Sequence, residues 1–183
     1  GETNSHLMIT QYYEGTGNNK WIEITNISQA PTPESTYYVA LFWNEDAKNP
    51  IGIKPSRNKA IPALVAGEIV KYQSTLMVTE PEYALDGNEI KSSVCSFTGD
   101  DILIISTTNN TTSWTNRLDV IGIDSLWGRD ISYLRKYGCV GVNTNTGFNP
   151  LDWFIYEIVD INNANVDSNL RIGKHYMGST SFT

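Results

Sequence analysis

Two short segments in which apolar and polar residues alternate, joined by a polar turn, constrain this chain more than any other feature. The stretch from Leu7 to Asn26 reads LMITQYY, then EGTGNNK, then WIEITN. Alternation with a period of two residues is typical of half-buried β-strands, and Gly and Asn tolerate the positive φ values of a turn. We therefore expect an antiparallel strand pair at the centre of a sheet. In this pair Ile22 and Ile24 face one side, and Trp21 and Glu23 face the other.

Further strand-like segments follow, separated by residues that favour turns. The strongest is residues 37–43 (YYVALFW), whose unbroken apolar run indicates burial on both faces. The other expected strands are residues 59–65, 68–74, 118–123, 132–136 and 151–158, the last a core strand anchored by Trp153. In residues 94–106 a Thr-Gly-Asp-Asp turn is expected to lead into a further buried strand. Closely spaced strands without regular alternation of strand and helix favour an all-β sandwich with at most one or two short helices.

One segment, residues 79–85 (TEPEYAL), has the residues expected at the start of a helix. Thr79 can cap its first turn, Pro81 suits the first turn, and the acidic Glu80 and Glu82 favour the positive helix end. No other segment sustains a period of 3.6 residues, so helix is expected to be a minor component.

The length and charge of the chain limit the classes of function. The 183 residues suit one domain, and the formal net charge is −7. An acidic chain without a run of Lys and Arg is a poor candidate for binding nucleic acid, because affinity for phosphate depends on clustered cations. No apolar run approaches the roughly 18 residues of a membrane span.

The ends of the sequence suggest its organisation. The chain begins with the polar run GETNSH, which we interpret as a leader or a remnant of a recombinant start, from which any signal peptide has been removed. We expect residues 1–6 to be this leader, residues 7–160 to form the domain and residues 161–183 to be a C-terminal extension. The expected location is secreted or at the cell surface.

The two cysteines, Cys95 and Cys139, lie at the ends of expected strands. They belong to no CxxC pair and are too few to form a structural zinc site. A disulfide is one interpretation and two partly buried thiols the other.

Carboxylates gather at the expected strand ends. Asp100 and Asp101 begin one buried strand, Asp119 begins another, and Glu14 and Glu23 flank the first turn. If Asp100, Asp101, Asp119 and Glu14 converge, their oxygens could form a calcium site, because calcium takes six to eight oxygen ligands. The alternative is that Asp100 accepts hydrogen bonds from backbone amides in its own turn.

Glu23 is expected to be covered beside Trp21, and a covered carboxylate must be paired or hydrogen-bonded. Lys20, Lys71 or a tyrosine hydroxyl are the expected partners.

Two tryptophans, Trp114 and Trp127, lie among polar residues in expected loops. Exposed aromatic side chains can stack on sugar rings or insert into a pocket of a partner protein. The alternative is that each tryptophan anchors its own loop. The chain has only two histidines, His6 and His175, and no G-x-S-x-G motif, so we predict that it is not an enzyme.

Four segments, in this order, resemble one family: ITQYYEGTGNNKWIEITN, FTGDDILII, LDVIGI and NPLDWFIYEI. They are similar to lamin tail domains of the kind found in bacterial exported proteins. That family combines a first strand ending in an acidic residue, a Gly/Asn loop, a W-I-E-I-x-N type strand, a GDD-led strand and a D-x-I-G strand.

The resemblance implies an immunoglobulin-like β-sandwich with a non-catalytic adhesive, scaffolding or targeting role. The expected partner is a protein or a glycan at the cell surface, and no cofactor is required. Two alternatives stay open: a metal-dependent, hydrolase-associated module that uses calcium, and a carbohydrate-binding module that uses Trp114 and Trp127.

Overall fold

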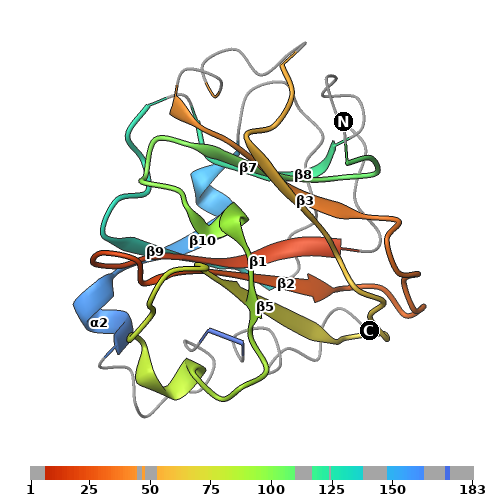
Figure 1. Cartoon of the computed structure of the whole chain (residues 1–183), viewed down its shortest axis with the longest axis horizontal. Helices are drawn as coiled ribbons and strands as arrows, with labels where there is room; N and C mark the ends of the chain where they lie inside the picture. The colour runs from red at the N-terminus through yellow and green to blue at the C-terminus, as the bar shows by residue number, and fades with distance from the viewer. Residues whose placement is uncertain are drawn as a thin grey trace.

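The computed structural model describes residues 7–44, 47, 53–109, 117–123, 125–137, 148–162 and 172–173. Its strands form two stacked sheets, an all-β sandwich as expected (Figure 1). The six-stranded sheet has the order β10-β9-β1-β2-β5-β6, and the four-stranded sheet has the order β4-β3-β7-β8. The strands are β1 (Leu7–Glu14), β2 (Lys20–Asn26), β3 (Tyr38–Phe42), β4 (Arg57–Ala60), β5 (Ile69–Gln73), β6 (Ile90–Lys91), β7 (Ile102–Ser106), β8 (Arg117–Ile121), β9 (Ile131–Arg135) and β10 (Trp153–Glu157).

The β1–β2 pair lies at the centre of the six-stranded sheet, as its alternating sequence predicts. The strands are antiparallel, with Tyr12 opposite Ile22 and Tyr13 opposite Trp21. Ile22 and Ile24 are buried in the core between the sheets, whereas Trp21 belongs to a separate apolar cluster. The predicted division of side chains between the two faces is confirmed.

Both faces of β3 are buried, which confirms the prediction from its apolar run. Val39 and Leu41 pack in the core between the sheets. Ala40 and Phe42 pack in a second cluster with residues of β7 and β8. Burial on both faces explains why this strand shows no alternation of apolar and polar residues.

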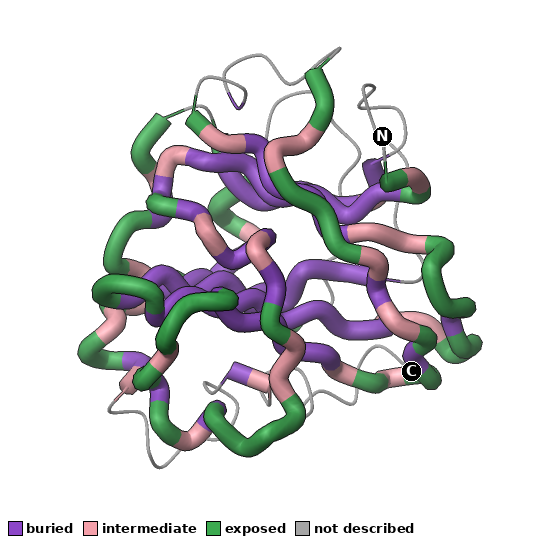
Figure 2. Tube along the Cα trace, viewed as in Figure 1, coloured by how far each residue is buried: buried purple, intermediate pink, exposed green. Residues whose placement is uncertain are grey.

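The six-stranded sheet is covered on its outer face as well. Tyr13, Trp21 and Leu134 form a cluster there with Ala84, Ile161 and Ile172, which come from later parts of the chain. Every residue of β1 and β2 is therefore buried, and Figure 2 shows the buried backbone concentrated in the strands of the two sheets.

The helix expected over residues 79–85 is wrong in length and in its cap. Only Glu82–Ala84 forms one turn of 3₁₀-helix, and its N-cap residue, Pro81, makes no side-chain capping bond. Asn19 Oδ1 accepts hydrogen bonds from the N–H groups of Thr79 and Glu80, at 2.8 and 3.1 Å. These bonds to a distant loop hold the start of the segment outside a helix.

The helical content is low, as expected. The α-helix α2 spans Ile158–Asn162, and further 3₁₀ turns lie at Ser93–Cys95 and Pro150–Asp152. Within the described ranges, no helix has the length and hydropathy needed to cross a membrane.

Cys95 is a free, buried thiol, and burial raises its pKa. The second cysteine, Cys139, lies outside the described residues. For Cys95 the interpretation as a buried thiol therefore holds.

Candidate functional site

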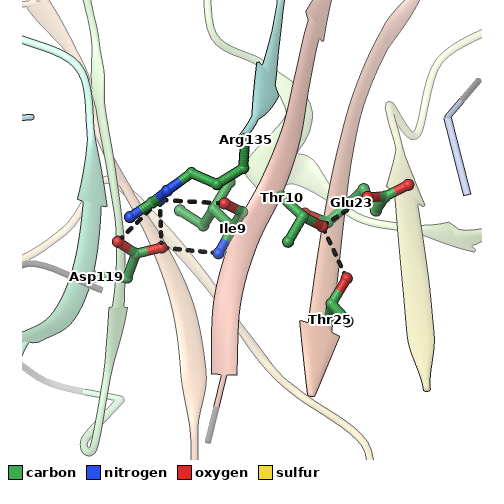
Figure 3. A network of polar contacts seen from close by, with 6 residues as sticks. All are labelled: Ile9, Thr10, Glu23, Thr25, Asp119 and Arg135. Atoms are coloured by element: carbon green, nitrogen blue, oxygen red, sulfur yellow. Dashed lines mark hydrogen bonds and ion pairs between the residues drawn. The ribbon is translucent and has the colours of Figure 1, made fainter. Parts of the chain in front are cut away.

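Asp119 does not lie at a solvent-exposed strand end; it forms a buried link between β8, β9 and β1 (Figure 3). Its Oδ2 accepts a hydrogen bond from Ile9 N–H at 2.8 Å, and both carboxylate oxygens lie 3.2 Å from Arg135 Nη1. Arg135 Nη1 also donates to Ile9 C=O at 3.3 Å. The Asp119–Arg135 pair therefore satisfies both backbone groups of Ile9.

The register of β1 explains why Ile9 needs these partners. β1 pairs with β9 only from Gln11 to Glu14, and its pairing with β2 shifts register between Ile9 and Gln11. Ile9 therefore has no strand partner on its β9 side, and a buried backbone group without a partner is costly. The two side chains replace the missing ladder bonds and join the two sheets at this point.

The surroundings of the Asp119–Arg135 pair indicate a structural role. Burial raises the pKa of Asp119, and the nearby Arg135 guanidinium and the N–H of Ile9 oppose that rise. The guanidinium also lies over the Trp153 ring, 4.6 Å from its centroid. Because Asp119 and Arg135 are both inaccessible to solvent, a substrate cannot reach them without opening the core.

The Gly-Asp-Asp turn is held by Asp101 rather than by Asp100, so the predicted turn residue is displaced by one position. Asp101 Oδ2 accepts from Thr98 N–H at 2.8 Å, and Oδ1 accepts from Asn44 N–H at 2.8 Å. Asp100 accepts a hydrogen bond from the Thr98 hydroxyl at 3.1 Å. Asp101 is buried, and this burial raises its pKa.

The last candidate calcium ligand, Glu14, accepts a hydrogen bond from Asp130 N–H and lies 3.8 Å from the ammonium of Lys20. Burial raises its pKa. Asp100 and Asp101 thus share Thr98 in one turn, whereas Asp119 and Glu14 bind other partners on other elements. Over the described ranges, no three His, Cys, Asp or Glu side chains are grouped so as to hold a metal ion.

We expect excess calcium to leave the melting temperature unchanged, and EDTA to have no effect. Asp101, Asp119 and Glu14 already accept hydrogen bonds from backbone amides, so an ion would have to displace those donors. A ligand that binds only the folded state raises its stability, so thermal unfolding measures binding directly. A rise of several degrees that EDTA reverses, and that Asp100→Asn removes, would show that the calcium alternative is right.

Two of the four family-like segments, FTGDDILII and LDVIGI, meet beside the 125–130 loop, which packs on the Gly-Asp-Asp turn. Gly99 C=O accepts hydrogen bonds from the N–H groups of Trp127 and Gly128, both at 2.9 Å. A Cβ atom on Gly99 would lie 2.6 Å from Arg129 N, and one on Gly122 would collide with Asp101 O. Both glycines have positive φ, +107° and +112°. The motifs thus mark a site of close backbone contact.

Gly122→Ala should lower the free energy of unfolding by about 3 kcal/mol, because the new methyl group meets a backbone carbonyl and the φ value disfavours any side chain. Gly17→Ala is the matched control: its φ is +58°, and nothing lies within 4 Å of the new Cβ. It should cost only about 1 kcal/mol. If denaturant titrations show that Gly122→Ala and Gly17→Ala lose the same free energy of unfolding, the close-contact explanation is wrong.

Trp127 is partly buried and holds its loop on the sandwich. Its indole N–H donates to Asp101 C=O at 2.8 Å. Its ring lies 4.6 Å from that of Tyr12 and 5.3 Å from those of Tyr133 and Phe148. These contacts fit the loop-anchoring alternative, and sugar binding by Trp127 stays a prediction. Trp114 lies outside the described residues.

Glu23 is fully buried on the outer face of the sheet (Figure 3). Its carboxylate accepts hydrogen bonds from two residues that are distant in sequence, Thr10 and Gly173. Its Oε1 accepts from the Thr10 hydroxyl at 2.6 Å, and its Oε2 accepts from Gly173 N–H at 2.8 Å. Because the Thr10 hydroxyl has one proton, the Thr25 hydroxyl donates to it across 2.8 Å. Lys71 pairs with Asp86 at 2.9 Å.

The outer edge of β10 is an exposed strand edge with apolar side chains. β10 pairs with β9, and no described strand pairs with its other side. Phe154 and Ile155 are 49% and 48% exposed, and Leu151 and Val159 flank them at 76% and 57%. The edge strand β4 differs, because it presents charged side chains, and β6 has only two residues.

No protein-family model matches the chain, and no curated protein matches it. The resemblance to lamin tail domains therefore stays a prediction that depends on the sequence motifs.

Proposed function

We propose that the chain is a non-enzymatic, exported interaction module that resembles a lamin tail domain, and that a partner protein adds a strand to the outer edge of β10. The observation that supports it most is the exposure of Phe154 and Ile155 on an edge strand whose own central residues carry no charge. A charge from the neighbouring segment, the ammonium of Lys136, lies over the Phe154 ring, 5.1 Å from its centroid. Natural proteins usually shorten, charge or cover such an edge.

The distribution of buried ionisable groups supports a non-catalytic role. The carboxylates of Asp101, Asp119 and Glu23 bind backbone amides or side chains that hold loops and strands together. A hydrolase needs a nucleophile with a base or a metal with an open position, in contact with substrate. Strand addition needs only an open edge, with main-chain hydrogen bonds for affinity and side-chain contacts for specificity.

Ile155→Lys tests the proposal, because a lysine on the edge opposes pairing with a further strand. Proteins captured from the cell-surface fraction of the source organism would be identified by mass spectrometry. Each purified partner would then be titrated by calorimetry against wild type and variant. We expect Ile155→Lys to weaken binding at least tenfold.

Met77→Lys is the matched control, because Met77 is an 81% exposed apolar residue that does not belong to β10. It should bind the partner like wild type. Equal affinities for Ile155→Lys and wild type would rule out the β10 edge, and turnover of a polysaccharide or phosphoester substrate would rule out a non-enzymatic role.

A further inference from the structure

A groove of about 470 Å³ lies at the opposite end of the six-stranded sheet from β10, along β5. Val70, which faces the core between the sheets, and Lys71, which faces the outer side, both line it. A groove lined from both faces of one strand runs along the edge of that strand. Its other walls are Pro62–Leu64, Tyr83, Asp86, Asn88, Ile90, Ile172 and Gly173.

The ladder of the sheet is incomplete at this groove. β6 pairs with β5 only at Tyr72 and Gln73, and no other described strand pairs with this edge of β5 before Tyr72. Hydrogen-bonded and non-hydrogen-bonded pairs alternate along an antiparallel ladder. Ser74 N–H donates to Lys20 C=O and Asn26 N–H donates to Glu68 C=O, so the even-numbered residues of β5 bond to β2. The N–H and C=O of Ile69 therefore point into the groove.

The chain before β6 does not continue the ladder. Asn88 N–H donates to Asp86 Oδ1 at 2.9 Å, a local turn that takes residues 86–88 to the far wall of the groove. The open position beside Ile69 and Lys71 is long enough for about three residues of extended chain at the usual rise of roughly 3.3 Å per residue.

The charges around the groove favour a basic ligand. The carboxylates of Glu68 and Asp86 lie at its rim, and both residues are exposed. Lys71, the one cation among the described residues that line it, donates to Ala84 C=O at 2.7 Å and pairs with Asp86. The hydrogen bond from Lys71 lowers the pKa of Asp86 below its ordinary value, because it stabilises the ionised carboxylate. Leu64, Ile90 and Ile172 supply an apolar lining between these charges.

We propose that this groove binds an extended peptide segment of a partner protein, which adds to β5 beside Ile69 and places a basic side chain at Glu68 and Asp86. The backbone of Ile69 supplies the main-chain hydrogen bonds, and the carboxylates at the rim favour a positively charged side chain on the peptide. This site is separate from the β10 edge and does not depend on it.

The test uses fluorescein-labelled five-residue peptides of alternating threonine and valine, with arginine, glutamate or proline at the centre. Fluorescence anisotropy titrations should show the arginine peptide binding at least tenfold tighter than the glutamate peptide, and more weakly as salt is raised. The proline peptide should lose binding, because it lacks the central N–H. In amide NMR spectra, the signals of Ile69 and Lys71 should shift on binding.

The double variant Glu68→Gln/Asp86→Asn should bind the arginine peptide about tenfold more weakly, while Glu34→Gln, an exposed site that does not line the groove, should not change it. Ile155→Lys should bind the peptide like wild type. The proposal is overturned if the arginine and glutamate peptides bind equally, if neither binds at millimolar concentration, or if the NMR shifts fall on β10. It also fails if sedimentation without peptide shows that a second copy of the chain fills the groove.

Discussion

Asp119→Ala should lower the free energy of unfolding by about 3–5 kcal/mol, the range seen when one partner of a buried ion pair is removed. The variant leaves the Arg135 guanidinium buried without its carboxylate, and it also removes the acceptor for Ile9 N–H. Urea titration followed by tryptophan fluorescence measures the loss.

A double variant distinguishes a ladder-replacing pair from an ordinary ion pair. Replacing a buried ion pair by apolar residues of similar volume is often close to neutral. Here Asp119→Leu/Arg135→Met should still cost about 2 kcal/mol, because the N–H and C=O of Ile9 lose their partners. A neutral double variant would show that Ile9 does not need these side chains.

The single variant Arg135→Met should be sensitive to pH. Burial already raises the pKa of Asp119 in the folded state, and removal of the guanidinium takes away an interaction that opposes this rise. When a carboxyl group has a higher pKa in the folded state than in the unfolded state, it stabilises the folded protein at pH values below its unfolded pKa of about 3.9. This stabilisation is lost as the pH rises from there through the folded-state pKa. The loss of unfolding free energy in Arg135→Met relative to wild type should therefore grow between pH 4.5 and pH 7.5. A deficit independent of pH would contradict the assignment to Asp119.

Trp127→Ala should lower the free energy of unfolding by about 2–4 kcal/mol, somewhat less than the roughly 3–5 kcal/mol of a fully buried aromatic side chain, because Trp127 is only partly buried. It removes contacts with Tyr12, Tyr133 and Phe148. Trp127→Phe keeps a ring but loses the hydrogen bond to Asp101 C=O, so it should cost about 1 kcal/mol.

Leu126→Ala controls for the Trp127 variants, because the neighbouring side chain is 59% exposed and its loss should change stability by less than about 0.5 kcal/mol. Denaturant titration and a glycan array would be run on the same proteins. If Trp127→Ala unfolds like wild type but loses binding to a glycan, the residue is a ligand-binding residue and not a loop anchor.

The sequence predicted most of the strands because alternation and unbroken apolar runs report local burial. Trp21 and Ile22 lie on opposite faces as their order requires. Alternation and apolar runs could not, however, distinguish an edge strand from a central strand. Residues 151–158 have the pattern of a core strand, and Trp153 is indeed buried, yet Phe154 and Ile155 are half-exposed because β10 lies at the edge.

The partners of buried polar groups could not be predicted, because they depend on register and on distant segments. Asp119 binds Ile9, 110 residues away, because pairing between β1 and β9 ends at Gln11. The helix expected at Thr79 fails because Asn19, 60 residues earlier, binds its N–H group. Neither contact leaves a local signal in the sequence.

The contact between Glu23 and Gly173 spans 150 residues, and it has a consequence for synthesis. A ribosome adds roughly 5–20 residues per second, so several seconds separate the emergence of β2 from that of the residue that completes its buried carboxylate. Folds dominated by distant pairings also form slowly, in about milliseconds to seconds. The outer face of the six-stranded sheet can therefore close over Glu23 only after Gly173 has been translated, and until then this carboxylate remains accessible to chaperones.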